Sequence, residues 1–169
     1  MPKSINKGVV AIPVVVASAL MLMAPMLASA QNAHFIRATS GTNNDGDLTC
    51  TFKMAGLGNE PTSPGEVDVT CSASADAIYQ CINRGGHNPE AANKEDVSAD
   101  VSGTETFDVT SNGQASGTIT VDAPSSTLDC PGGQRLILAQ VTYSEVTISG
   151  AGDSQGLPDA TFTDPRADL

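Results

Sequence analysis

Alternation of apolar and polar residues with a period of two is the feature that most constrains the fold of this chain. Short alternating runs recur between clusters of Gly, Asn, Asp and Pro, and no stretch after residue 30 shows sustained helical periodicity. This pattern is typical of half-buried β-strands joined by turns. The sequence therefore predicts an all-β protein, an immunoglobulin-like antiparallel sandwich of two sheets, with a jelly roll or a small barrel as the alternative.

Turn sequences predict how the strands pair. Residues 104–110 and 117–123 flank Asn112-Gly113, a dipeptide that two-residue hairpin turns favour, and they form the clearest predicted hairpin. Residues 34–39 and 48–54 form a second predicted hairpin across an Asp-Gly turn.

Three further strands are predicted, over residues 67–73, 77–82 and 135–149. In the last of these the apolar positions change from odd-numbered to even-numbered, and this slip predicts a β-bulge near Ser144 and Glu145.

The polar segment 83–100 is the longest predicted loop, with at most one turn of helix in it. Long loops on a rigid sandwich are where recognition residues usually lie. The candidate binding residues in this segment are Arg84, His87, Asn88, Asn93 and Lys94.

The first 30 residues resemble a secretion signal. Lys3 and Lys7 precede an apolar run over residues 9–27, and Ala28-Ser29-Ala30 is a small-x-small cleavage pattern. We expect cleavage after Ala30 and release outside the cell. The apolar run is also long enough to span a bilayer, so a retained anchor is the alternative.

The remaining chain suits one domain. We expect residues 31–151 to form the sandwich and residues 152–169 to be a loose C-terminal tail, with one edge strand around residues 160–163 at most.

Four cysteines lie in the exported part, which is an even number in an oxidising compartment, so two disulfides are expected. They are Cys50, Cys71, Cys81 and Cys130. Four cysteines allow three connectivities. Cys50 and Cys71 are predicted to share the inward face of neighbouring strands, which favours the pairs Cys50–Cys71 and Cys81–Cys130.

Acidic residues dominate the exported part. Without Lys3 and Lys7, six basic residues stand against nineteen acidic ones, a net charge of −13. Because the basic residues are scattered singly, nucleic acid is an unsuitable partner. Calcium is a weaker hypothesis, since no EF-hand spacing is present. The weak metal candidates are Asp45, Asp47, Glu95 and Asp96.

One motif suggests catalysis. Residues 152–156 match G-x-S-x-G, but an α/β-hydrolase needs a histidine later in the chain than the serine, and none follows Ser154. We therefore expect no enzymatic activity and no cofactor.

Several short motifs resemble those of small exported bacterial and archaeal proteins of unknown function. The matching residues are His34-Phe35-Ile36, Ala55-Gly56-Leu57-Gly58, Cys81 with Asn83, Ala92-Asn93-Lys94, and Cys130-Pro131-Gly132-Gly133-Gln134. The resemblance supports the pairing of Cys81 with Cys130, and it implies no activity, cofactor or site. This chain departs from the pattern at His87-Asn88-Pro89, where those proteins carry Asn-His-Pro, and in having Cys50 and Cys71.

These features together predict a non-enzymatic extracellular protein that binds a partner or serves as a structural component. The expected partner is an extracellular protein or a cell-surface component, contacted through residues 83–96 or through the sheet edges. A small secreted hydrolase and an acidic, calcium-dependent surface protein are the alternatives.

Overall fold

The computed structural model describes residues 32–58, 65–85 and 93–167, and within these ranges the regular elements are eight β-strands. The predicted signal lies outside the described residues, which include no helix long and apolar enough to cross a membrane. The strands are β1 (His34–Thr42), β2 (Leu48–Ala55), β3 (Glu66–Ile82), β4 (Lys94–Asp108), β5 (Ala115–Val121), β6 (Arg135–Gly150), β7 (Asp153–Gly156) and β8 (Ala160–Thr163).

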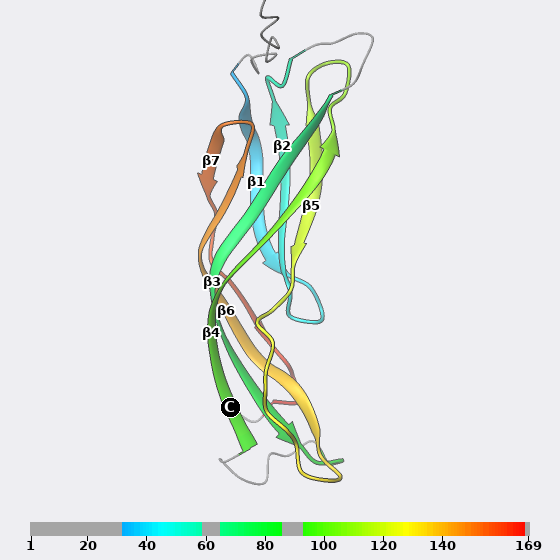
Figure 1. Cartoon of the computed structure of the whole chain (residues 1–169), viewed down its shortest axis with the longest axis vertical. Coiled ribbons are helices and arrows are strands. Elements are labelled where there is room, and N and C mark those ends of the chain that lie inside the picture. The colour runs from blue at the N-terminus through cyan, green and yellow to red at the C-terminus, as the bar shows by residue number, and fades with distance from the viewer. Residues whose placement is uncertain (1–31, 59–64, 86–92, 168–169) are drawn as a thin grey trace, which may run out of the picture.

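The strands form two antiparallel sheets that pack face to face, which confirms the predicted sandwich (Figure 1). One sheet has the order β1-β2-β5, and the other has the order β4-β3-β6-β7 with β8 also paired to β6. A constant-type immunoglobulin domain places its fourth strand in the first sheet. Here β4 pairs with β3 in the second sheet instead.

The core lies between the sheets because inward positions alternate along each strand. On β2 the side chains of Leu48, Cys50, Phe52 and Met54 are buried, while the residues between them are exposed or partly exposed. They meet alternate residues of β3, β5 and β6 in one cluster. Each fully buried aliphatic side chain contributes roughly 1.5 to 3 kcal/mol through removal of apolar surface from water.

The predicted bulge in β6 is confirmed. Ser72 of β3 pairs with Thr147 and Ser74 pairs with Ser144, so β6 carries one extra residue between them. Glu145 lies in the bulge with a φ of 53°. The bulge turns Val146 inward where the preceding buried residues had been odd-numbered.

The predicted hairpin across Asn112-Gly113 is wrong in its pairing. The turn forms, with the Thr110 amide donating to the Gln114 carbonyl at 2.8 Å. The strands then diverge, because β4 belongs to one sheet and β5 to the other. The ring of Phe107 instead packs over Gly117, where an added Cβ would lie 2.0 Å from Phe107 Cε1. The missing side chain at Gly117 makes room for this ring.

The boundaries of the third and fourth strands also differ from the prediction. Residues 67–73 and 77–82 belong to one continuous strand, β3, of 17 residues. Strand β4 begins at Lys94, so the second half of the predicted loop is paired β-structure. The polar residues of β4 are compatible with this because β4 is an edge strand with much of its surface in water.

The loose tail predicted for residues 152–169 is wrong, whereas the edge strand at residues 160–163 is confirmed as β8. Both β7 and β8 pair with β6. The Phe35 amide of β1 donates to Asp153 Oδ2 at 3.0 Å, and the hydroxyl of Ser40 donates to the Pro158 carbonyl. The segment therefore closes one side of the sandwich.

The long strands extend beyond the smaller sheet. In Figure 1, β3, β4 and β6 continue below β1, β2 and β5, and the yellow chain between β5 and β6 runs along this lower part. We call residues 122–134 the connecting segment. We call the end where β3 finishes at Ile82 and β6 begins at Arg135 the basal end.

Candidate functional site

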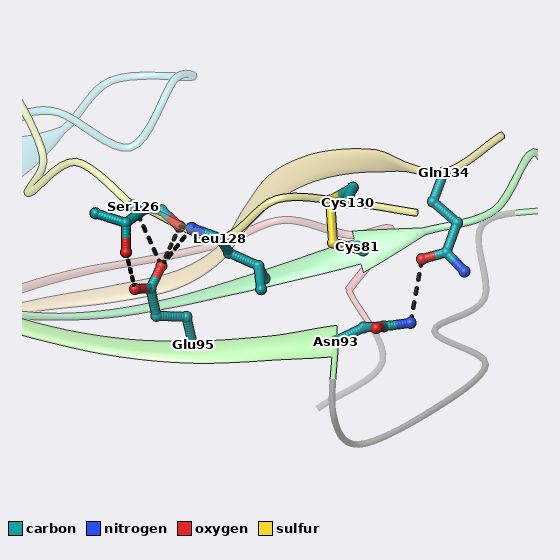
Figure 2. Close-up of a disulfide and its surroundings, with 8 residues drawn as sticks. Cys81, Asn93, Glu95, Ser126, Leu128, Cys130 and Gln134 are labelled. Atoms are coloured by element: carbon teal, nitrogen blue, oxygen red, sulfur yellow. Dashed lines mark hydrogen bonds between the residues drawn. A yellow bond between two sulfur atoms is a disulfide. The ribbon is translucent and has the colours of Figure 1, made fainter. Parts of the chain in front are cut away.

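Glu95 anchors the connecting segment to the start of β4. Its carboxylate accepts hydrogen bonds from the Ser126 hydroxyl, from the Thr127 amide at 2.9 Å and hydroxyl at 2.7 Å, and from the Leu128 amide at 3.0 Å (Figure 2). The hydrogen bond from Ser126 is the largest of several that lower the pKa of Glu95 below its usual value. This weak calcium candidate therefore already has internal donors.

Cys81 and Cys130 form a disulfide beside this anchor, with their Cα atoms 5.5 Å apart (Figure 2). It ties the connecting segment to the end of β3. The Tyr79 hydroxyl, two residues earlier on β3, donates to the Pro124 carbonyl at 2.5 Å. The connecting segment is thus fixed at several points along its length.

Both predicted disulfide pairs are confirmed. Cys50 and Cys71, however, do not lie on neighbouring strands of one sheet. Cys50 is on β2 and Cys71 is on β3, so their disulfide crosses the core between the sheets. Two intramolecular disulfides indicate a non-reducing compartment.

A pocket of about 620 Å³ opens at the basal end. Its described lining comes from the end of β3 and from the residues that lead into β6, namely Ile82, Asn83, Arg84, Gly133, Gln134 and Arg135. The Asn93 side-chain amide donates to Gln134 Oε1 at 3.2 Å and links the start of β4 to this wall (Figure 2). We call this the basal pocket.

Strand register places three charged or polar residues on one face of the sheet at the basal end. Arg135 pairs with Ile82, while Lys94 and Ile137 pair with Gln80 from either side. Directly paired residues project from the same face of a sheet. Arg135, Lys94 and Gln80 therefore belong to one face at the basal end.

Gln80 is the unusual member of this group. Its side chain is 0 % exposed, and neither its amide nitrogen nor its amide oxygen has a hydrogen-bond partner among the residues that the structure describes. An unpartnered buried amide costs about 1 to 3 kcal/mol. Such a residue calls for an explanation, since an apolar side chain of similar size would remove that cost.

Arg84 and Arg135 are exposed at the mouth of the pocket. Neither makes a hydrogen bond or an ion pair with another described residue. The ion pair observed among the described residues joins Arg166 to Asp164. Asp164 has a lowered pKa, chiefly through its hydrogen bond to Arg166, with a smaller electrostatic contribution from Arg135. Two guanidinium groups thus face solvent beside one pocket.

The five predicted binding residues have different outcomes. Arg84 lines the pocket, Asn93 hydrogen-bonds to its wall, and Lys94 begins β4 opposite Gln80. His87 and Asn88 lie outside the described residues.

Sequence reasoning did not select Arg135, Gln134 or Gln80. Arg135 and Gln134 lie about fifty residues after Arg84, and only the pairing of β3 with β6 brings them together. The one local feature of the sequence that could have indicated Arg135 is its place at the start of a strand, directly after the turn at residues 131–134. Gln80 had no signal, because its burial depends on strand register.

The described residues contain no group of three or more His, Cys, Asp or Glu side chains placed to hold a metal ion. Asp47 accepts hydrogen bonds from Asn43 Nδ2 at 2.9 Å and from the Ala123 amide at 3.2 Å, so it joins the hairpin to the connecting segment. Asp45 and Asp96 are exposed. Calcium binding at these residues stays a prediction.

Ser154, the serine of the G-x-S-x-G motif, is exposed on β7, and β7 pairs with β6. A nucleophile elbow requires a turn from strand to helix. The motif is here part of an antiparallel strand.

Comparison with known proteins finds no match to this chain among family models, curated proteins or solved structures.

Proposed function

We propose that this protein is an extracellular binding module that recognises its partner with the basal pocket. The observation that carries the proposal is the pair of exposed guanidinium groups of Arg84 and Arg135, which make no hydrogen bond or ion pair with another described residue, at the mouth of one pocket in a strongly acidic chain. Exposed arginines whose guanidinium donors are not used within the described part of the chain are available to a ligand, and arginine contributes strongly to binding interfaces.

The scaffold around the pocket supports a binding role. The Cys81–Cys130 disulfide and the Glu95 hydrogen bonds hold the pocket walls in place before any ligand arrives. A site held in this way loses little conformational entropy on binding. Its recognition groups also lie at strand ends, where a rigid sheet positions them.

The pocket chemistry suits binding better than catalysis. The described side chains that line it supply guanidinium and amide groups with one aliphatic surface. These groups bind and orient ligands. A hydrolase site would require a nucleophile and a general base in reach of one another.

The proposal is tested by the binding of the labelled, disulfide-bonded exported chain to intact cells of the producing organism. We expect saturable binding that R84A/R135A weakens at least about tenfold, because each charged hydrogen bond contributes about 1.5 to 3 kcal/mol. The matched control is R37A/K53A, which removes two exposed charges that pair across β1 and β2. Equal binding by both double variants would contradict the proposal, as would the absence of saturable binding.

A further inference from the structure

We propose that the ligand of the basal pocket is a peptide carboxylate, bound by Arg84 and Arg135. This inference rests on the binding role proposed above and names the chemical class of the ligand. The carboxylate is either the free carboxyl terminus of a chain or an Asp or Glu side chain.

The guanidinium groups favour an oxyanion. Arginine presents its donors in a planar fork that matches a carboxylate or a phosphate with two parallel hydrogen bonds. Arg135 pairs with Ile82, and Arg84 lies two residues beyond Ile82 in the chain, so both groups line the same pocket. Lys94, opposite Gln80, adds a third positive charge to this end.

The charge of the whole molecule favours a carboxylate over a phosphate. The exported chain has a net charge of −13, and its field repels an approaching anion in proportion to the charge of that anion. A phosphate group near neutral pH carries up to twice the charge of a carboxylate. Since only a few basic groups at the basal end offset this repulsion, a single carboxylate is the better match.

The uncharged groups favour a peptide over a sugar. The oxygen of the Gln134 amide accepts from Asn93, which leaves the Gln134 amide nitrogen at the pocket wall to donate to a peptide carbonyl. Sugars in comparable sites usually stack on exposed Trp or Tyr rings. The sequence has no Trp, Tyr143 is buried in the core, and the Tyr79 hydroxyl is bonded to Pro124.

The test is calorimetric titration of the disulfide-bonded exported chain with four probes at low salt. They are acetyl-tetra-alanine with a free carboxyl terminus, the same peptide with a terminal amide, the amidated peptide with one alanine replaced by glutamate, and inorganic phosphate. We expect at least one of the two carboxylate peptides to bind at least about tenfold more tightly than the neutral peptide, and the one that does identifies the source of the carboxylate.

The same titration with variants localises the site. R84A and R135A should each weaken carboxylate binding about tenfold, while R37A and K53A should leave it unchanged. Neither basal arginine makes a hydrogen bond or an ion pair with another described residue, so the melting temperature should change little in R84A and R135A, which separates lost binding from lost folding.

Two results would overturn the ligand class: equal binding of the neutral and carboxylate peptides, or tighter binding of phosphate than of either carboxylate. If no probe binds while cell binding still depends on Arg84 and Arg135, the peptide carboxylate is wrong and the binding module stands. If cell binding is independent of both arginines, the binding module itself is wrong.

Discussion

At the scale of single residues, Gly46 and Tyr143 show how the hairpin between β1 and β2 is fixed to the rest of the fold. The buried Tyr143 hydroxyl donates to the Gly46 carbonyl at 2.8 Å. Burial is the main cause of the raised pKa of Tyr143, so this hydroxyl stays protonated and able to donate. Gly46 has a φ of +92°, a conformation that suits glycine.

Replacing Gly46 with alanine should destabilise the fold by about 2 to 4 kcal/mol, because backbone strain and a steric clash add. A Cβ at this position would lie 2.5 Å from Leu138 Cδ2. Gly152→Ala is the matched control, since Gly152 has a φ of +86° and open space around it. Urea denaturation measures the free energy of unfolding of both variants. An equal loss of stability in the two would contradict the role of the clash at Gly46.

Replacing Gln80 with methionine should stabilise the ligand-free protein by about 1 to 2 kcal/mol, because the change removes an unpartnered buried amide while keeping a similar volume. Urea denaturation of the ligand-free chain is the measurement. A destabilised Q80M protein would mean that the Gln80 amide already has partners in solution.

At the scale of elements, Glu95 holds the connecting segment only while it is ionised. Its pKa is lowered from the usual 4.5 in the folded state, so its contribution to stability is complete above that value and is lost as the pH falls through the lowered pKa. The anchor should therefore fail in acid and hold at neutral pH.

The E95Q variant should accordingly be less stable than the parent at neutral pH, and the difference should shrink as the pH falls below 4.5, the usual pKa of this side chain. In E95Q the side-chain NH2 group would also face the backbone N–H donors of Thr127 and Leu128, which adds to the loss of stability. Thermal unfolding over this pH range is the measurement, with Glu105→Gln as the control because Glu105 is exposed on the same strand. A difference that does not change with pH would exclude the ionised anchor.

The strands themselves were largely predictable, because the buried positions on β2, β3 and β6 alternate and are occupied mainly by apolar residues, a pattern that is visible in the sequence. The pairing of β4 was not. A strong local turn at Asn112-Gly113 suggested β5 as its partner, whereas pairing with β3 covers 15 positions and dominates. The same long-range pairing explains why Arg84 was identified and Arg135 was missed.

At the scale of the whole molecule, β4 ends its sheet and leaves one edge without a paired strand among the described residues. Acidic side chains follow this edge, namely Glu95, Asp96, Asp100, Glu105 and Asp108. Charged side chains on an edge strand oppose pairing with another copy. A structural role through this edge is therefore less favoured than binding at the basal end.

The chain should be a monomer at physiological salt, because edge pairing would bring two strongly acidic chains together, each with a net charge of −11. Light scattering coupled to size-exclusion chromatography gives the mass directly. A stable dimer would contradict this expectation.

The most direct test of the basal pocket as the binding site is a map of backbone amide chemical shifts during titration with the carboxylate peptides. The account predicts that the changes concentrate at residues 82–84 and 133–135 and saturate together. Changes confined to β1 and β2, or spread along the outer edge of β4, would contradict it.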